Sequence, residues 1–127
     1  MKKYLLSILV SLTLFGCSGN KFMVAPATKD AGLEMFTRMY LPEGIETVEE
    51  AVRYVLMPTG YILALNCPAC PSEAKIIAQD PISPLALKSE LTTVRRAIAL
   101  ILGHDAGMVV DEKNKIMTFR FINEEEK

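Results

Sequence analysis

Two segments of the chain repeat apolar residues at helical spacing, with charged and polar residues between them. In each, five apolar residues fall at i, i+3, i+4, i+7 and i+8: Val48, Ala51, Val52, Val55 and Leu56 in the first, and Val94, Ala97, Ile98, Ile101 and Leu102 in the second. This spacing is typical of an amphipathic helix that packs one face against a core. We therefore predict helices over residues 47–57 and 94–102.

Capping residues stand at both ends of these helices. Thr47 precedes Glu50 by three positions, which predicts a reciprocal capping box at the start of the first helix. Thr93 is the expected N-cap of the second helix, and Gly103 is expected to end it. The first helix should end before Pro58, because proline cannot continue the backbone hydrogen bonding.

Shorter apolar runs around the helices predict strands. We expect strands over residues 36–41, 61–65, 85–90, 107–112 and 115–122, the last two joined as a hairpin through Lys113 and Asn114. A short helix is expected over residues 72–79. An offset of 46 residues superimposes the two long helices and the strands that follow them, which indicates two structural half-units.

The expected order β-α-β-(α)-β-α-β-β predicts an α+β domain in which two amphipathic helices pack on small antiparallel or mixed sheets in two layers. We assign residues 35–122 to this domain, residues 17–34 to a flexible linker before it, and residues 123–127 to an acidic tail. Fewer than a hundred residues remain for the domain, which is too few for a second core.

The N-terminus has the pattern of an export signal. Lys2 and Lys3 precede an uncharged apolar run that is shorter than the roughly 20 residues needed to span a membrane. The sequence Leu14-Phe15-Gly16-Cys17 resembles the bacterial lipobox, which implies removal of residues 1–16 and diacylation of Cys17. Ser18, in place of an aspartate, implies sorting to the periplasmic face of the outer membrane.

The charge of the chain argues against nucleic acid as a partner. The precursor has 14 basic and 15 acidic residues, and loss of Lys2 and Lys3 with the signal leaves 12 basic residues and a net charge of about −3. A protein that binds a phosphate backbone is expected to carry a basic stripe or cluster, and this sequence has none.

Several short motifs resemble one known family. They are Leu41-Pro42, Thr47-Val48-Glu49-Glu50-Ala51, Pro58-Thr59-Gly60-Tyr61, Val109-Val110-Asp111 and Met117-Thr118-Phe119. Over about residues 36–121 the chain resembles the PilL family, lipoproteins of type IVB pilus and conjugative-element assembly. The small domain of that family is similar to the N-terminal domains of secretins and to the lipoprotein DotD.

The resemblance implies an assembly protein without enzymatic activity or cofactor. Its expected partners are a secretin or other periplasmic components of a pilus or conjugation machine, in which the domain can form part of a ring. A pilotin-like chaperone that only delivers the secretin is a further alternative. Because exposed sheet edges pair readily with other chains, we expect an outer strand, residues 115–122, to make the partner contact.

The motif Cys67-Pro68-Ala69-Cys70 is the strongest candidate for chemistry in the sequence. In an oxidising periplasm we expect a structural disulfide between Cys67 and Cys70 that stiffens the loop between the half-units. The alternative function is a membrane-tethered thiol-disulfide redox protein that uses the same pair, since a strand, Cys-x-x-Cys and a helix also occur in thioredoxin-like proteins.

Other chemistry has little support in the sequence. His104 is the only histidine and follows the predicted end of a helix, where it is expected to interact with the last carbonyls. We expect no metal site, because a closed zinc site needs four ligands. Arg95 and Arg96 lie near a helix N-terminus, where the helix dipole disfavours positive charge. Their presence is explained by an ion pair within the domain, by a contact with a partner, or by solvation alone.

Overall fold

The computed structural model of the protein describes residues 32–123 and residue 125. The elements in chain order are η1 (Gly32–Glu34), β1 (Phe36–Arg38), α1 (Val48–Leu56), η2 (Met57–Thr59), β2 (Ile62–Leu63), α2 (Ala74–Gln79), η3 (Pro84–Leu87), β3 (Leu91–Thr93), α3 (Val94–Leu102), β4 (Ala106–Asp111) and β5 (Ile116–Phe121). The predicted α+β class is confirmed. The signal peptide, the lipidation site Cys17 and most of the predicted linker lie outside the described residues.

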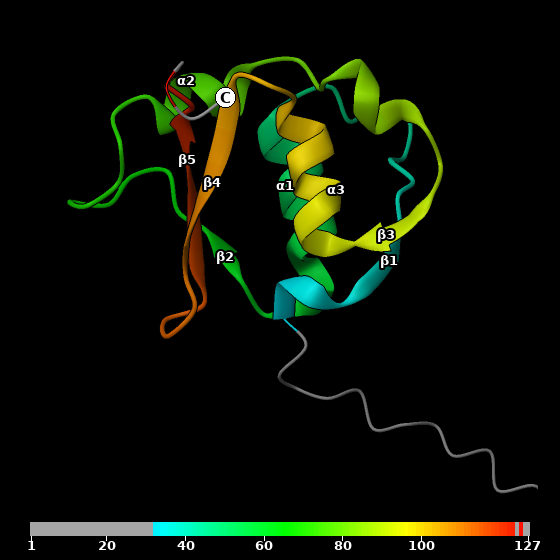
Figure 1. The fold of residues 1–127 in the computed structure, drawn as a ribbon, viewed down its shortest axis with the longest axis horizontal. Coiled ribbons are helices and arrows are strands. Elements are labelled where there is room, and N and C mark those ends of the chain that lie inside the picture. The colour runs from blue at the N-terminus through cyan, green and yellow to red at the C-terminus, as the bar shows by residue number, and fades with distance from the viewer. Residues whose placement is uncertain (1–31, 124, 126–127) are drawn as a thin grey trace, which may run out of the picture.

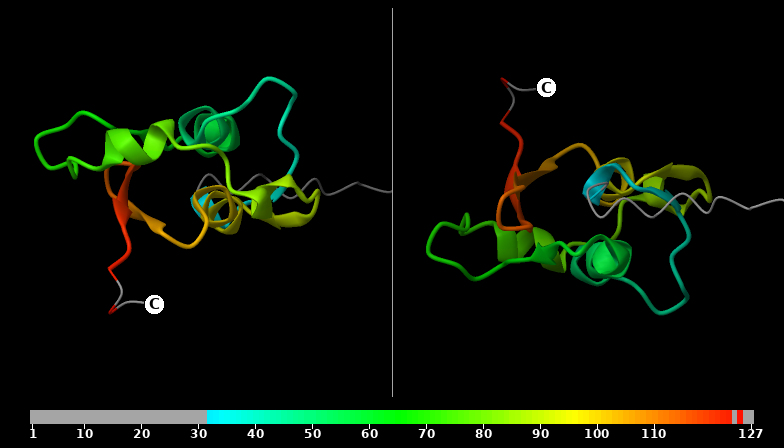
Figure 2. Two further views of the ribbon diagram at one scale, coloured as in Figure 1. Left: turned by 90° about the horizontal axis from the view of Figure 1, so that it is seen from above. Right: turned by 90° about the horizontal axis from the view of Figure 1, so that it is seen from below.

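Helices α1 and α3 form the centre of the molecule, with a small sheet on either side of them (Figures 1 and 2). They lie side by side and run in opposite directions, so that α1 leads to β2 at one end and α3 leads to β4 at the other (Figure 1). Strands β1 and β3 form an antiparallel two-stranded sheet, and the other sheet has the order β2-β5-β4. Helix α2 packs against α1 and β5.

The apolar stripes predicted from the sequence form the core. Nine of the ten stripe residues are buried, and Leu102 is the exception because it lies at the last turn of α3 and is only half-buried. From the three-stranded sheet, Met117 and Phe119 add two side chains with no exposed surface. Full burial of a large apolar side chain contributes roughly 1.5–3 kcal/mol, so these two helices and β5 supply most of the driving force for folding.

Both predicted helix starts are confirmed at the level of individual hydrogen bonds. The Thr47 hydroxyl accepts from the backbone N–H of Glu50 (3.4 Å), and the Glu50 carboxylate accepts from the N–H groups of Thr47 (3.2 Å) and Glu46 (3.0 Å). At α3, the Thr93 hydroxyl accepts from the N–H of Arg96 (3.3 Å). Each bond satisfies a backbone donor that has no partner within the helix, either in its first turn or just before it.

The strand predicted over residues 85–90 is wrong. Pro84–Leu87 forms a 3-10 turn instead, and the strand lies later, at Leu91–Thr93. Pro84 provides a fixed backbone angle and no N–H, and the Ser83 hydroxyl accepts from the N–H of Leu85 (3.4 Å), so a local turn forms there. The alternation of Leu85 and Leu87 with polar or small residues therefore did not indicate a strand.

The two half-units predicted from the 46-residue offset have matching positions in the fold. Strands β2 and β4, which follow the two long helices, lie on opposite sides of β5, and the strands that precede the helices pair with each other. The connections differ, because β3 continues directly into α3 whereas residues 39–47 separate β1 from α1.

Candidate functional site

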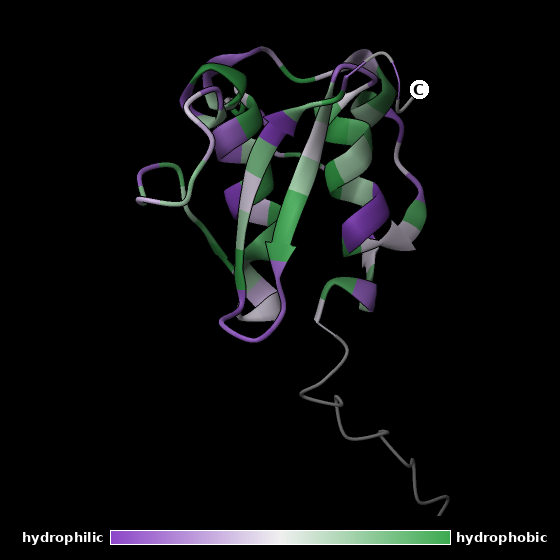
Figure 3. Ribbon diagram, turned by 60° about the vertical axis from the view of Figure 1, so that its left-hand side comes forward, coloured by the Kyte–Doolittle hydropathy of each residue, from purple (hydrophilic) through white to green (hydrophobic). Residues whose placement is uncertain are grey.

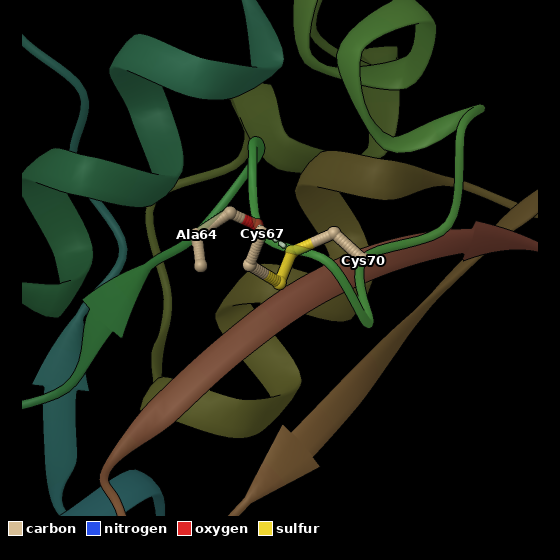
Figure 4. The surroundings of a disulfide bond; sticks show 3 residues. All are labelled: Ala64, Cys67 and Cys70. Carbon is tan, nitrogen blue, oxygen red and sulfur yellow. Dashed lines mark hydrogen bonds between the residues drawn. A yellow bond between two sulfur atoms is a disulfide. The ribbon is translucent and has the colours of Figure 1, made fainter.

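The loop that contains the two cysteines lies beside the three-stranded sheet. The Ala64 N–H donates to the carbonyl of Met117 (2.8 Å), which extends the parallel pairing of β2 with β5 by one residue before the chain leaves the sheet. The structure then joins Cys67 and Cys70 by a disulfide, with 5.0 Å between their Cα atoms (Figure 4). The N–H of Cys70 donates to the carbonyl of Cys67 (3.0 Å) and closes the turn.

The surroundings of the disulfide differ from those of an activated thiol. Helix α2 begins at Ala74, beyond Pro71, so neither cysteine lies in the first turn of a helix whose dipole would stabilise a thiolate. The sulfur of Cys70 lies 3.5 Å from the carbonyl oxygen of Ala64. A disulfide sulfur has no proton to donate, so this is a packing contact between the bridge and the end of β2. The geometry therefore suits a structural disulfide better than a nucleophile.

A pocket of about 270 Å³ lies between the disulfide loop and the sheet. It is lined by Cys67, Ala69, Cys70, Val109, Val110, Asp111, Ile116, Met117 and Thr118. Thr118 is buried, and its hydroxyl has no hydrogen-bond partner among the described residues. An unpaired buried hydroxyl costs about 1–3 kcal/mol, so a partner group that enters this pocket and binds it would recover that energy.

No motif or spacing in the sequence marks Thr118 as a residue with a chemical role. It lies between Met117 and Phe119, whose side chains point into the core, so the alternation of a strand places Thr118 on the opposite, outer face of the sheet. A polar residue on the outer face of a strand is usually solvated. The hydroxyl lies in the pocket between the disulfide loop and the sheet, so its burial depends on the tertiary structure.

The outer strands of the three-stranded sheet are β2 and β4, not β5. Strand β5 pairs with β2 on one side and β4 on the other, so the prediction that residues 115–122 form an exposed edge is wrong. The order follows from the parallel pairing of β2 with β5, a contact between residues more than fifty positions apart. Strand β4 is the longer outer strand, with six residues, and its outer edge has no neighbouring strand among the described residues.

The Pro58-Thr59-Gly60-Tyr61 motif ends α1 and leads into β2. The Thr59 hydroxyl donates to the carbonyl of Leu56 (2.7 Å) and accepts from the N–H of Tyr61 (3.1 Å). Gly60 has a φ of 77°, in the left-handed region that favours glycine. The Tyr61 ring is buried, with the Lys115 ammonium 5.0 Å from its centroid. The motif therefore has a structural role in the turn.

The Val109-Val110-Asp111 motif leads into the turn of the β4–β5 hairpin, which the register confirms as antiparallel. The Asp111 carboxylate accepts from the side-chain amide of Asn114 (2.6 Å) and from its backbone N–H (3.1 Å). These bonds, the side-chain one first, lower the pKa of Asp111 below its ordinary value. Figure 3 shows the hydrophilic turn at the end of two largely hydrophobic strands.

The two arginines at the start of α3 are explained by ion pairs. Arg95 donates to the Glu34 carboxylate of η1, and its guanidinium also lies 3.6 Å from Glu112 in the hairpin turn. Arg96 lies 3.8 Å from the Glu90 carboxylate. Of the explanations that the sequence left open, an ion pair within the domain therefore applies to both residues.

His104 lies on a second pocket, of about 350 Å³, formed where α3 meets β4. His104 itself is exposed and directly follows Gly103, whose φ of 78° ends the helix as predicted. Within residues 32–123 and 125, no group of three or more histidine, cysteine or acidic residues is arranged to hold a metal ion. The polar side chains that line the pocket are those of Asp80, Ser83, His104 and Asp105.

No helix in the described part of the chain is long and apolar enough to cross a bilayer. Comparisons with protein-family models, with curated proteins and with solved structures find no match to this chain.

Proposed function

We propose that the protein is a periplasmic lipoprotein, anchored to the outer membrane through Cys17, that serves assembly of a type IVB pilus or conjugative transfer apparatus. It does so by binding a secretin or another envelope component. The observation that carries the proposal is the unpaired outer edge of β4 next to a pocket that contains a buried hydroxyl with no partner among the described residues.

The sequence supports the anchor. The basic start, the apolar run and Leu14-Phe15-Gly16-Cys17 together resemble the signal and lipobox of bacterial lipoproteins. Two acyl chains on one residue anchor a protein stably, since each buried methylene contributes about 0.8 kcal/mol. In this proposal the lipid holds the domain at the membrane, and partner binding falls to the folded residues.

The α+β class of the fold supports the proposal of a module of the secretin N-domain type. Two antiparallel amphipathic helices lie between two small sheets, one of them mixed (Figure 1), whereas the sequence predicted helices and sheets in two layers. The residues that carry the resemblance around Gly60 and Asp111 make turns and bonds that specify this fold. Their roles are structural, as expected for a module whose function is contact with other proteins.

The contact surface that we propose is the edge of β4. An extended segment of the partner would pair with the free N–H and C=O groups of this strand. Val109 is 42% exposed on β4 and lines the pocket, so a partner side chain placed beside it would reach Thr118. Backbone pairing would provide affinity, and the pocket would provide specificity.

The test is affinity isolation of the tagged, lipidated protein from solubilised envelopes, followed by mass spectrometry. We expect recovery of a secretin or another pilus or conjugation component, and at least a tenfold loss of that recovery for Val109→Glu, which places a charge in the contact; tenfold corresponds to about 1.4 kcal/mol. Ala99→Glu, at an exposed position of α3, is the matched control. Equal recovery with Val109→Glu would exclude the β4 edge, and absence of any such component would contradict the assembly function.

A further inference from the structure

The two-stranded sheet carries its large apolar side chains on the face that points away from the core. In the antiparallel register Phe36 lies opposite Thr93, and Arg38 lies opposite Leu91, so Phe36 and Leu91 are diagonal neighbours on one face. Phe36 is 72% exposed and Leu91 is 70% exposed, whereas Thr92 on the inner face is buried. This pattern is the reverse of that expected for a sheet with one solvated face.

Two more exposed apolar side chains flank these strands. The pairing continues past Arg38, because the N–H of Met39 donates to the carbonyl of Glu90 (2.7 Å) and the Met39 side chain is buried. Tyr40 follows and is 62% exposed, and Leu87, at the end of η3, is 73% exposed. We call Phe36, Tyr40, Leu87 and Leu91 the β1–β3 patch. Single exposed apolar residues are common, but a group around one small sheet indicates a contact surface.

Two basic side chains beside the β1–β3 patch have no acidic partner among the described residues. Arg38 and Lys88 are exposed and form no ion pair within the described residues. The neighbouring acidic side chains Glu34 and Glu90 are instead paired with the two arginines of α3. A surface with aromatic and aliphatic side chains and unpaired cations is complementary to phospholipid headgroups, which present phosphates above an apolar layer.

The position of the patch along the chain also favours the membrane. Cys17 precedes Phe36 by 19 residues (36 minus 17), and β1 is the first strand after the proposed anchor. Even fully extended, 19 residues span at most about 68 Å at about 3.6 Å per residue. A linker of this reach lets β1 contact the bilayer that holds Cys17, and the three-stranded sheet lies on the other side of the two helices (Figure 2).

We propose that the β1–β3 patch rests on the phospholipid surface that holds Cys17. Phe36 and Leu91 enter the boundary between headgroups and acyl chains, and Arg38 and Lys88 bind lipid phosphates. This orientation turns the β2-β5-β4 sheet toward the periplasm, where its free edge is accessible to a partner. The inference rests on the lipid anchor of the proposed function and adds a second, non-covalent membrane contact.

The absence of tryptophan from the sequence allows a direct test. Phe36→Trp places a single fluorophore in the patch, and Ile62→Trp, at a residue that is 64% exposed on β2, is the matched control on the opposite sheet. Each lipidated mature protein is reconstituted into vesicles of phosphatidylethanolamine and phosphatidylglycerol that contain a brominated acyl-chain lipid. We expect the Phe36→Trp variant to show blue-shifted emission and about twofold or more the quenching of the Ile62→Trp variant, since only the former fluorophore would reach the acyl boundary.

Two further measurements separate this inference from the anchor itself. Adding Arg38→Glu and Lys88→Glu to Phe36→Trp should reduce the quenching toward the Ile62→Trp level. Flotation of the unmodified mature protein with the vesicles reports whether lipidation anchors it. If the protein floats but the Phe36→Trp variant is no more quenched than the Ile62→Trp variant, the inference is overturned and the anchor stands. If the fluorophore in the patch is shielded only by an added envelope protein or a second copy of the chain, the patch is a protein interface and the inference is likewise wrong.

Discussion

In the proposed function, Thr118 contributes to partner binding at the expense of stability. Its hydroxyl is buried beside the disulfide loop without a partner in the described residues, and that burial costs free energy. We predict that Thr118→Val raises the free energy of unfolding by about 1 kcal/mol, because it replaces the hydroxyl by a methyl group of similar size. Urea unfolding monitored by circular dichroism measures this change.

The same variant separates the two roles of the residue. If the hydroxyl binds the partner, Thr118→Val lowers partner recovery although it stabilises the fold. Thr118→Ser keeps the hydroxyl and loses the methyl group, so it should lower stability and retain more recovery. This role for Thr118 would be contradicted by a Thr118→Val variant that is less stable than the wild type and still recovers as much partner protein as the wild type does.

Asp111 makes a pH-dependent contribution at the hairpin turn. Its folded-state pKa is lowered below the ordinary value of 3.8, chiefly by the Asn114 side chain, so the ionised carboxylate stabilises the fold. This stabilisation is fully present above pH 3.8 and is lost as the pH falls through the lower folded pKa. We predict that Asp111→Ala is less stable than the wild type near neutral pH and that the difference narrows below pH 3.8.

The check is thermal unfolding of both proteins across that pH range. Asn114→Ala removes the side-chain donor to Asp111 and the lowering of the Asp111 pKa that this donor causes. It serves as a control, because its stability difference from the wild type should also narrow at low pH. A stability difference that stays constant between neutral and acidic pH would contradict this account of Asp111.

At the scale of elements, both long helices begin with a threonine cap, and α1 has in addition the two hydrogen bonds that the Glu50 carboxylate accepts. Thr47 belongs to a reciprocal capping box, whereas Thr93 only accepts a bond from the first turn. We predict that Thr47→Ala and Thr93→Ala each lower the free energy of unfolding by about 1 kcal/mol. Chemical denaturation measures both, and Thr47→Ser, which keeps the accepting oxygen, should recover most of the loss.

The disulfide between Cys67 and Cys70 is expected to contribute little to stability. The bridge closes a loop of only four residues, so its effect on the entropy of the unfolded chain is small. We predict that Cys67→Ser with Cys70→Ser lowers stability by less than about 2 kcal/mol and leaves partner recovery intact if the contact is the β4 edge. Urea unfolding and the same affinity isolation measure the two effects.

Single cysteine variants distinguish the redox alternative. With Cys70→Ser, the exposed Cys67 would trap mixed disulfides with substrate proteins if the pair normally cycles. If the pair is structural, the Cys70→Ser variant should form no more mixed disulfides than the wild-type protein does. Trapped adducts recovered from envelopes would therefore favour thiol-disulfide exchange over the assembly function.

At the scale of the whole molecule, the proposals assign different contacts to the two sides of the helix pair. In these proposals the β1–β3 patch contacts the membrane and the β4 edge contacts the partner, and Figure 1 shows the two sheets on opposite sides of α1 and α3. We predict that Cys17→Ser moves the protein from the membrane fraction to the soluble fraction and lowers partner recovery from intact envelopes by at least about tenfold, since tethering raises the local concentration of the domain. Membrane fractionation followed by immunoblotting measures the redistribution, and mass spectrometry of the N-terminal peptide of the mature wild-type protein tests the acyl chains directly; an unmodified Cys17 would contradict lipidation.

The features that the sequence predicts are those that depend on interactions between residues close together in the chain. The helices at 48–56 and 94–102, their caps and the β4–β5 hairpin depend on residues that are close in sequence, so periodicity and short motifs were sufficient to predict them. Cys67 and Cys70 were identified in the same way, because they are only three positions apart and their pairing needs one tight turn.

Other features depended on contacts between distant residues. The location of β3 and the central place of β5 follow from pairing with β1 and β2, which lie more than fifty residues earlier in the chain. The burial of Thr118 requires the disulfide loop to lie beside β5. The sequence alone therefore determined the local elements through backbone geometry and capping, whereas strand order, open edges and exposed faces were decided only when the helices packed and brought those strands together.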